Sequence, residues 1–343
     1  MKNIPIENIY YLLAYAWDKL LESKKIHIEG CAFQGEVNLL AFVLVKGVTH
    51  LLKRGFDRDY RVFEENTGFP RGKWDIQTTL KRGLLAQNSI HCEYTEMDHN
   101  LLHNQIIKTT LKRLICTEGL DKNIKKDIHQ LYFRMGGIDQ IDLSERLFRK
   151  IRLHRNNAFY GFLLNICELI YTNLLPTETT GHFQFRDFLQ DENKMAVLFE
   201  AFVRNFYRIE LSSTEYRSFQ SEILKWDMQG LTPEDDKKLP QQKTDTTITY
   251  WDNRKIIIET KYYAQILKEN YNSYKLSADN LRQITTYLDL CPQAFEGILI
   301  YVQTDSKLDM HYQRKGKKLR VYSLDLSQPW QAIHKDLISL LPA

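Results

Sequence analysis

Two runs of β-forming residues flank a turn in the segment DTTITYWDNRKIIIETK, residues 245–261. Residues 251–254 between the runs are turn formers, so the segment predicts a β-hairpin. Side chains two residues apart on a strand point to the same face, which places Glu259 and Lys261 together. Either of the two registers that the turn allows brings Asp245 to the same side of the hairpin. The sequence therefore predicts one cluster of three charged side chains.

This cluster has the composition of a magnesium site. Cross-strand neighbours lie about 5 Å apart at Cβ, close enough for Asp245 and Glu259 to hold one divalent ion. Mg²⁺ prefers carboxylate oxygens, lowers the pKa of a bound water and stabilises a pentacovalent phosphorus. Lys261 is the candidate for orienting and activating the attacking water. The alternative is an exposed, salt-bridged hairpin, but Ile256–Ile258 predict a buried strand, where charges are unfavourable unless they are paired or bind metal.

The pattern also resembles a known signature. An acid followed by Glu-x-Lys on the next strand is similar to the motif of the PD-(D/E)xK nuclease superfamily. The resemblance implies catalytic positions at Asp245, Glu259 and Lys261. The sequence departs from the motif at Pro240, which precedes Asp245 by five residues instead of one.

Two neighbouring helices extend this resemblance. Gln283 and Tyr287 are four residues apart on a predicted helix, and they resemble the Gln-x-x-x-Tyr element of one branch of these nucleases. The resemblance implies that both lie beside the catalytic site; the alternative is an ordinary amphipathic helix. Glu200 is a single acid in the apolar helical run 198–203, where the superfamily often supplies an extra metal ligand. The alternative is that Glu200 faces solvent.

The elements around the hairpin indicate an α/β fold. Hydrophobic periodicity predicts helices that cover both faces of a mixed sheet. The predicted helices are 195–209, 276–290 and 329–341, and the predicted strands are 221–227, 244–250, 255–261, 297–303 and 319–326. The resemblance implies that this part is a PD-(D/E)xK endonuclease domain.

The N-terminal half is predicted to be a separate α+β domain. Its predicted helices are 9–17, 37–54 and 100–119, and its predicted small sheet is 56–74. Residues 176–181 contain a Pro and a Gly without apolar periodicity, as is typical of a linker. We therefore expect domains at 1–175 and 182–343, and an α+β organisation overall.

Composition and length exclude several classes of protein. Of the 343 residues, 43% are apolar and 26% are charged, which indicates a globular protein. No apolar run approaches the roughly 20 residues that cross a bilayer, and the N-terminus lacks the apolar core of a signal peptide. We expect no membrane contact and a cytoplasmic location. The five cysteines are scattered without a Cys-x-x-Cys pair, which argues against a zinc site or a disulfide framework.

A closer resemblance extends over nearly the whole chain. The segments 3–17, 98–111 and 245–263 resemble the McrC family, the nuclease subunits of McrBC modification-dependent restriction systems. This implies a Mg²⁺-dependent endonuclease that works with a McrB-like AAA+ GTPase, a hexameric ring that recognises double-stranded DNA with methylated cytosine. It also implies that the N-terminal domain docks on the ring and that the chain stimulates its GTPase. Since the sequence has no Gly-x-x-x-x-Gly-Lys-Ser/Thr loop, we expect GTP on the partner.

A basic cluster in the predicted nuclease domain is the candidate for DNA contact. Its members lie in a predicted hairpin turn and are Arg314, Lys315, Lys317, Lys318 and Arg320. Such side chains can neutralise DNA phosphates. Because the net charge of the chain is only +4, the local distribution of charge is more informative than the total.

Two other functions remain open from the sequence. One is a degenerate nuclease fold that only activates a GTPase, which the intact Asp245, Glu259 and Lys261 argue against. The other is a stand-alone PD-(D/E)xK repair nuclease, which would cut DNA without any NTPase. Assays of GTP turnover and DNA breaks, with and without the partner, distinguish the three.

Overall fold

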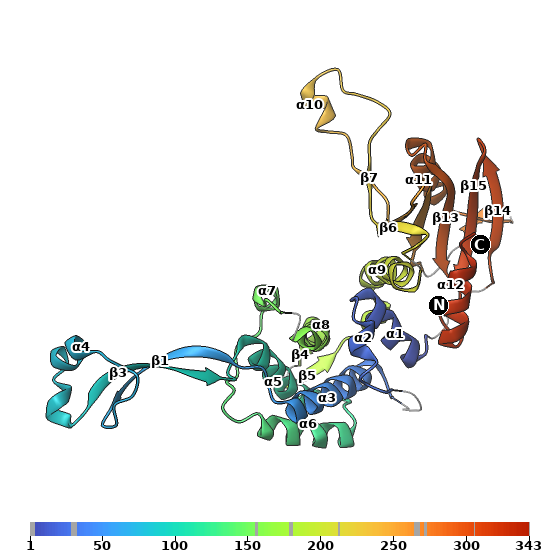
Figure 1. Ribbon diagram of the computed structural model, residues 1–343. Helices are drawn as coiled ribbons and strands as arrows, with labels where there is room; N and C mark the ends of the chain where they lie inside the picture. The colour runs from blue at the N-terminus through green and yellow to red at the C-terminus, as the bar shows by residue number, and fades with distance from the viewer. Residues whose placement is uncertain are drawn as a thin grey trace. The chain divides into compact units, whose positions relative to one another are not determined.

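The computed structural model describes residues 4–28, 33–154, 157–177, 181–211, 213–263, 268–270, 273–304 and 306–342 (Figure 1). Cys31 and positions 178–180 of the predicted linker lie outside these residues. The chain divides into two compact units: unit 1 consists of Met1–Glu36 and Asp187–Ala343, and unit 2 is Val37–Arg186. These bounds differ from the expected 1–175 and 182–343, since the first 36 residues belong with the C-terminal part.

Aromatic packing explains this division. The N-terminal helix α1 (Ile6–Ala16) lies against helix α9 (Glu192–Glu210) of the same unit. The ring of Tyr15 contacts those of Phe202 and Phe206, at centroid distances of 6.0 and 5.4 Å. Burial of large aromatic rings is strongly stabilising, so the aromatic N-terminal helix forms part of the core of unit 1.

Unit 1 is built on a six-stranded mixed sheet with the order β14-β15-β13-β10-β9-β6. The strands are β6 (Tyr216–Gln220), β9 (Thr246–Tyr250), β10 (Lys255–Lys261), β13 (Ala294–Val302), β14 (Asp309–Arg314) and β15 (Lys317–Leu324). Strands β10, β13 and β15 are parallel, and the other neighbours are antiparallel. The predicted α/β class with a mixed sheet is confirmed. The sequence did not predict β14, because five of its six side chains are exposed and leave no apolar alternation at this sheet edge.

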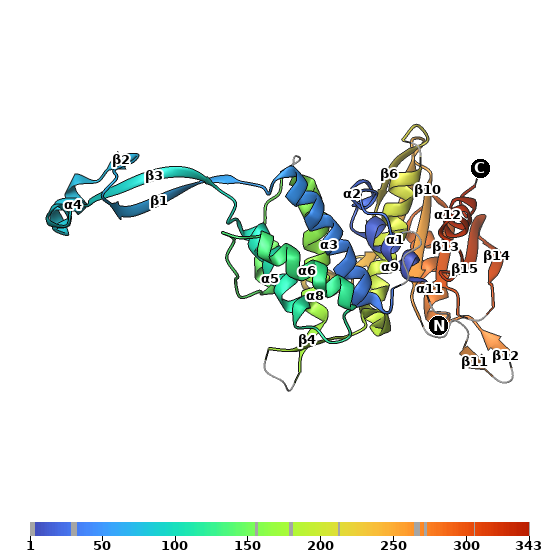
Figure 2. The same cartoon turned by 90° about the horizontal axis from the view of Figure 1, so that it is seen from below.

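Helices cover both faces of this sheet (Figures 1 and 2). Ile257 of β10 points to one face and packs with helix α11 (Ala278–Leu290). Helices α9 and α12 (Trp330–Ser339) pack on the sheet from the other face. They are joined where the Tyr207 hydroxyl donates to the Leu337 carbonyl oxygen at 2.9 Å. The predicted C-terminal helices are thereby confirmed.

Short elements complete unit 1. A ribbon of β7 (Ile223–Leu224) and β8 (Gln242–Lys243) carries the short helix α10 (Pro233–Asp236) and stands out from the sheet beside β6 (Figure 1). The strand predicted at 221–227 is therefore displaced toward the N-terminus and interrupted. The other elements are α2 (Leu20–Ser23), η3 (Phe188–Gln190), β11 (Lys268–Asn270) and β12 (Ser273–Lys275).

Unit 2 has a helical body. Its elements are α3 (Glu36–Arg54), α5 (Leu102–Ile115), α6 (Lys122–Arg134), α7 (Glu145–Lys150), α8 (Ala158–Asn173), β4 (Leu174–Pro176) and β5 (Phe183–Phe185). The helices predicted at 37–54 and 100–119 are confirmed. Within the described part of the chain, no helix has the length and apolarity that crossing a membrane requires.

A long β-ribbon, residues 59–98, extends from this body; we call it the arm. Strand β1 (Asp59–Thr67) pairs antiparallel with β3 (Ile90–Asp98), and β2 (Lys73–Trp74) pairs with β3. Both views show β1 and β3 running away from the helices to a tip that carries α4 (Ile76–Lys81) and η1 (Leu84–Gln87) (Figures 1 and 2). The predicted small sheet is present, but its strand β3 was not predicted because polar residues interrupt its pattern.

Candidate active site

Strands β9 and β10 form the predicted hairpin. Thr246, the first residue of β9, lies opposite Ile258, and one further step in this register places Asp245 opposite Glu259. Asn253 in the turn has φ of 68°, a left-handed conformation that Asn adopts more readily than most residues. The structure therefore selects one of the two predicted registers and brings the first acid to the level of the second.

Four of the predicted residues form one chain of hydrogen bonds. Lys261 Nζ donates to Glu259 Oε1 at 2.7 Å and to Gln283 Oε1 at 2.9 Å. Gln283 Nε2 donates to the Tyr287 hydroxyl at 2.8 Å, and this hydroxyl donates to the Lys243 carbonyl oxygen at 2.8 Å. The predicted i, i+4 pair on α11 thus faces the site. This series of hydrogen bonds fixes the ammonium group of Lys261 beside Glu259.

Asp245 is held by the residue between Glu259 and Lys261. The Thr260 backbone N–H and its hydroxyl both donate to Asp245 Oδ2, at 2.8 and 2.6 Å. Thr260 is itself largely buried. These two bonds fix the Asp245 carboxylate at the end of β9, where it meets the last residues of β10.

Burial and a neighbouring negative charge raise the pKa of each acid, with Asp245 acting on Glu259 and Glu200 acting on Asp245. Glu259 is only 1% exposed. Burial, together with the negative charge of Asp245, raises the pKa of Glu259 to about 7, although Lys261 acts in the opposite direction. Burial likewise raises the pKa of Asp245, against the hydrogen bonds from Thr260. A nearby cation would offset both effects.

The available donor atoms fit a hard divalent cation. Glu259 Oε2 is buried and has no hydrogen-bond partner among the described residues, which is unfavourable for a carboxylate oxygen unless it binds something else. Carboxylate oxygens are the protein ligands that Mg²⁺ prefers, and it usually takes few of them. Asp245 and Glu259 together therefore suit Mg²⁺ with further positions for water and substrate.

Glu200 is near this site but is not gathered with the two acids. Its Oε1 accepts a hydrogen bond from Arg204 at 2.8 Å, and Arg204 also donates to the Asp245 carbonyl oxygen at 3.0 Å. The charge of Glu200 contributes to the raised pKa of Asp245, so the two carboxylates are close. Across the described ranges, no three His, Cys, Asp or Glu side chains are grouped to hold a metal ion. The predicted third ligand is instead bound to an arginine.

The predicted basic cluster is divided between the two faces of β15. Arg314 and Lys315 form ion pairs with Asp289 at 2.8 and 3.3 Å. Lys317 donates to two carbonyl oxygens at the end of α11. Because neighbours on a strand point to opposite faces, Lys318 points away from α11. The predicted residues thus do not form a single positive surface.

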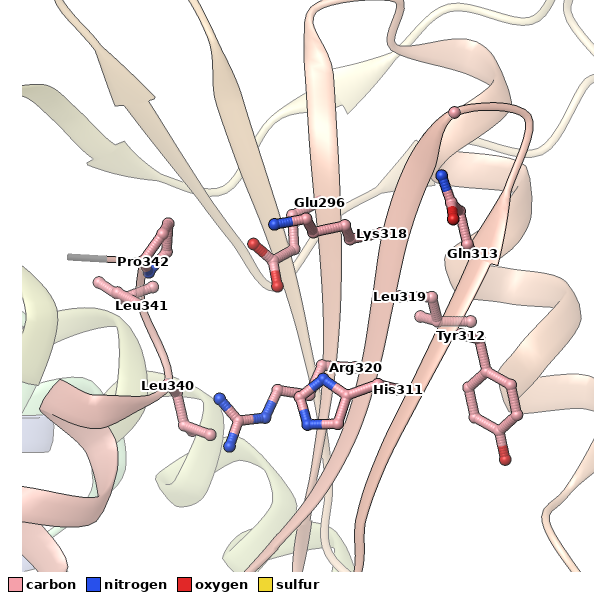
Figure 3. A pocket seen from close by; sticks show the side chains of 11 residues that line it. Glu296, His311, Tyr312, Gln313, Lys318, Leu319, Arg320, Leu340, Leu341 and Pro342 are labelled. Atoms are coloured by element: carbon pink, nitrogen blue, oxygen red, sulfur yellow. The ribbon is translucent and has the colours of Figure 1, made fainter.

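Lys318 and Arg320 line a pocket of about 520 Å³ on the face opposite α11, together with His311 and Glu296 (Figure 3). Arg320 forms two hydrogen bonds with the Asp309 carboxylate, both at 2.9 Å. The acids Glu296 and Asp309 therefore balance much of the positive charge at this end of the cluster.

Sequence reasoning did not predict three contributors to the site. Arg204 is four residues after Glu200, a spacing at which opposite charges meet on a helix, so this pair could have been found. Thr260 acts at a strand end and Lys243 acts through its carbonyl oxygen. Neither role has a signal in residue type or spacing.

The chain is similar to known proteins over most of its length. The family model described as McrBC 5-methylcytosine restriction system component matches residues 10–302. The type IV methyl-directed restriction enzyme EcoKMcrBC of Escherichia coli (strain K12) is 31% identical over 342 residues, which cover 98% of this chain and 97% of that protein. A solved half-complex from a tetradecameric assembly of Thermococcus gammatolerans McrB AAA+ hexamers with bound McrC matches with a TM-score of 0.63 and 18% identity, over 98% of this chain and 76% of that chain. This last likeness shows a shared fold.

Proposed function

The chain belongs to the family of McrBC 5-methylcytosine restriction system components, and from this premise we propose that it is the DNA endonuclease subunit of such a system. It hydrolyses phosphodiester bonds in methylcytosine-containing double-stranded DNA with Mg²⁺. Its partner is a McrB-like AAA+ ring that binds GTP, and the chain stimulates the GTPase of that ring. The solved assembly of similar fold, which contains McrB hexamers with bound McrC, supports this choice of partner.

One observation carries the nuclease proposal: a buried acid, Glu259, and a partly buried acid, Asp245, converge with a single lysine. A purely structural ion pair would match one acid with one base. Lys255, at the start of β10, forms such a pair with Glu222 at 2.7 Å. At the other end of β10, Lys261 pairs with Glu259 at 2.7 Å while Asp245 adds a second negative charge. An uncompensated buried charge is strongly unfavourable, so a bound cation is the simplest source of balance.

The roles of the residues follow from their contacts. Asp245 and Glu259 are the proposed ligands of Mg²⁺, which supplies Lewis acidity at the scissile phosphate when bound. Lys261, held by Glu259 and Gln283, orients the attacking water. Gln283 and Tyr287 limit the movement of the ammonium group, because Tyr287 is anchored to the main chain of β8. Such fixed positioning is what a hydrolytic site requires.

The turn between β14 and β15 is the proposed DNA-backbone contact. Arg314 and Lys315 share the single acid Asp289, which leaves a net positive charge on an exposed turn. Surface ion pairs of this kind are weak and can be replaced by a phosphate. Lys318 and Arg320 line the pocket on the other face of β15, beside Glu296, so the turn residues Arg314 and Lys315 carry this proposal.

The arm is the proposed docking element for the partner ring. Its tip exposes five large apolar side chains: Phe69 88%, Trp74 55%, Ile76 63%, Leu80 62% and Leu85 55%. Exposed apolar groups in such density mark a protein-binding surface, and aromatic residues often supply most of the binding energy. The docking role expected for the N-terminal domain is thereby assigned to residues 59–98.

The test uses two lysines of the same strand. Lys261→Ala should abolish cleavage of methylated DNA in the presence of partner, GTP and Mg²⁺, while stimulation of GTP hydrolysis is unchanged. Lys255→Ala also breaks a partly buried ion pair, between Lys255 of β10 and Glu222, but should still cut, so it controls for damage to the strand. Normal cleavage by Lys261→Ala would refute the assignment. GTPase stimulation without breaks by the wild-type chain would favour a non-catalytic activator, and cutting without any NTPase would favour a stand-alone nuclease.

A further inference from the structure

Arg204 connects two of the candidate metal ligands, Glu200 and Asp245. It lies on α9, one turn after Glu200, and its Nη1 donates both to Glu200 Oε1 and to the Asp245 carbonyl oxygen, at 2.8 and 3.0 Å. The guanidinium group therefore spans from the helix to the start of β9. Glu200 and the main chain at Asp245 are held together by this one side chain.

The same contact holds one carboxylate oxygen of Glu200, the third candidate metal ligand. Its charge is close enough to Asp245 to raise the pKa of that acid. Yet one of its two carboxylate oxygens, Oε1, accepts the hydrogen bond from Arg204, and no three-ligand group exists within the described residues. At the same time Glu259 Oε2 is buried, and none of the residues that the structure describes forms a hydrogen bond with it. A third carboxylate thus lies near the site with one of its two oxygens bonded to an arginine.

We propose that Arg204 is a latch that withholds Glu200 from the metal site until the guanidinium group is drawn to a DNA phosphate. This inference rests on the proposed function of the site. The side chains of Arg204 and Glu200 are 26% and 31% exposed, so a phosphate can approach the latch. Guanidinium binds phosphate through two parallel hydrogen bonds to a charged group, whereas only one of the two present bonds of Arg204, the bond to Glu200, has a charged acceptor.

Release of Arg204 would change the site in one step. The carboxylate of Glu200 would be released from Arg204, and the metal ion held by Asp245 and Glu259 would gain a third protein ligand. The site would then bind metal tightly only when substrate is present. Arg204 is a positioning residue in this scheme, because it acts through Glu200.

Metal binding by the full chain without DNA tests the latch directly. Mn²⁺ takes the same oxygen ligands as Mg²⁺, and its free concentration can be followed by electron paramagnetic resonance. Arg204→Met should bind Mn²⁺ about tenfold more tightly than the wild type, a change of the size seen when groups that hold metal ligands are altered. In the double variant Arg204→Met/Glu200→Gln this gain should disappear. Glu200→Gln alone should bind Mn²⁺ as the wild type does.

Two further variants keep the test decisive. Arg208→Met removes another α9 arginine, which pairs with Asp18, and should leave Mn²⁺ affinity unchanged. Should Arg204→Met lower the thermal unfolding midpoint, Arg204→Lys replaces it, because it keeps the charge but reaches less well to both acceptors; a smaller gain is expected. A folded Arg204 variant without any gain, or a tenfold loss of affinity in Glu200→Gln alone, overturns the latch.

Asp245→Asn separates this inference from the proposed function. If Asp245→Asn abolishes Mn²⁺ binding while the Arg204 variants show no gain, only the latch is wrong. If Asp245→Asn binds Mn²⁺ as the wild type does, the proposed metal site itself is wrong and the latch falls with it.

Discussion

Two β-ribbons of this protein depart from the usual distribution of polar and apolar residues in opposite directions. The hairpin β9–β10 buries charged groups, with Glu259 at 1% exposed. The arm exposes apolar groups, with Phe69 at 88%. A folded chain alone stabilises neither arrangement well, since buried charges lose hydration and exposed apolar groups order water. Each ribbon is therefore best explained by something that binds it: a cation in one case and an apolar protein surface in the other.

The two ribbons are also held together differently. The second strand of the hairpin has Ile256, Ile257 and Ile258 fully buried between helices. Burial along the strands of the arm is confined to His91 and Cys92 of β3, and polar pairs cross the rest: Arg71 bonds both Glu65 and Glu96, on opposite strands, at 3.0 and 2.9 Å. Exposed ion pairs contribute little, typically between 0 and about 1 kcal/mol each. The arm can accordingly adapt to a partner, whereas the hairpin cannot.

The largest expected difference between the ribbons is in stability. Ile257→Ala should lower the free energy of unfolding by about 2–5 kcal/mol, because it leaves a cavity under α11. Val62→Ala in the arm should change it by less than about 0.5 kcal/mol, since Val62 is 62% exposed. Chemical denaturation of both variants measures the contrast. Equal losses would show that the arm has a core of its own.

A second comparison uses pH in the metal-free protein. The pKa of Glu259 is about 7 in the folded chain, above its ordinary value of 4.5, so the folded state binds the proton more tightly. Its contribution to stability is complete below pH 4.5 and is lost as the pH rises to about 7. The free energy of unfolding of Glu259→Gln, relative to that of the wild type, should thus rise by on the order of 3 kcal/mol between pH 4.5 and pH 7.

Denaturation curves at several pH values check this expectation, with Lys255→Ala as a control that has no altered carboxylate at the site. Mg²⁺ at pH 8 should stabilise the wild type and leave Glu259→Gln unaffected. A difference between the two proteins that does not vary with pH would contradict the assigned shift.

A third variant concerns the tip of the arm. Phe69→Ala should weaken binding to the partner ring by about 2 kcal/mol, as loss of a well-buried aromatic anchor does. DNA cleavage and GTPase stimulation should decline together, since both need the complex, whereas the unfolding midpoint should not change. Titration of the partner with fluorescently labelled chain measures the affinity. Unchanged affinity in Phe69→Ala and in Leu80→Ala would remove the docking role from the tip.

The smallest effect is expected inside the catalytic site. Gln283→Ala removes one of the two acceptors of Lys261 and should lower the cleavage rate by about tenfold. Thr285→Ala on the same helix loses only a hydrogen bond within α11 and serves as the control. Because Gln283 belongs to the proposed catalytic site and not to the proposed docking element, stimulation of the partner GTPase should be equal in both variants. A full rate in Gln283→Ala would mean that Glu259 alone positions the lysine.

The sequence predicted one ribbon far better than the other. The hairpin has local turn formers, a buried run of isoleucines and charges at period two, so residues 255–261 were predicted with the bounds of β10. The partner of β1 in the arm is β3, which begins at Ile90 after a tip of two short helices, and its polar pattern has no signature. Pairing across such a distance depends on the whole fold.

The same distinction applies to the site. Spacing alone brought Asp245, Glu259 and Lys261 together, and the helical i, i+4 rule added Gln283 and Tyr287. The sequence did not reveal that Arg204 occupies Glu200 or that β15 turns Lys317 and Lys318 to opposite faces. These depend on which elements meet in space.

The central claim is that Asp245 and Glu259 share one cation. Anomalous diffraction from crystals of the full chain grown with Mn²⁺ tests it most directly. The account predicts one strong peak within about 2.3 Å of an oxygen of each carboxylate. In Glu259 this oxygen is Oε2, which is buried and has no hydrogen-bond partner among the described residues. A Mn²⁺ ion bound elsewhere, with both carboxylates in their present positions and no peak between them, would contradict it.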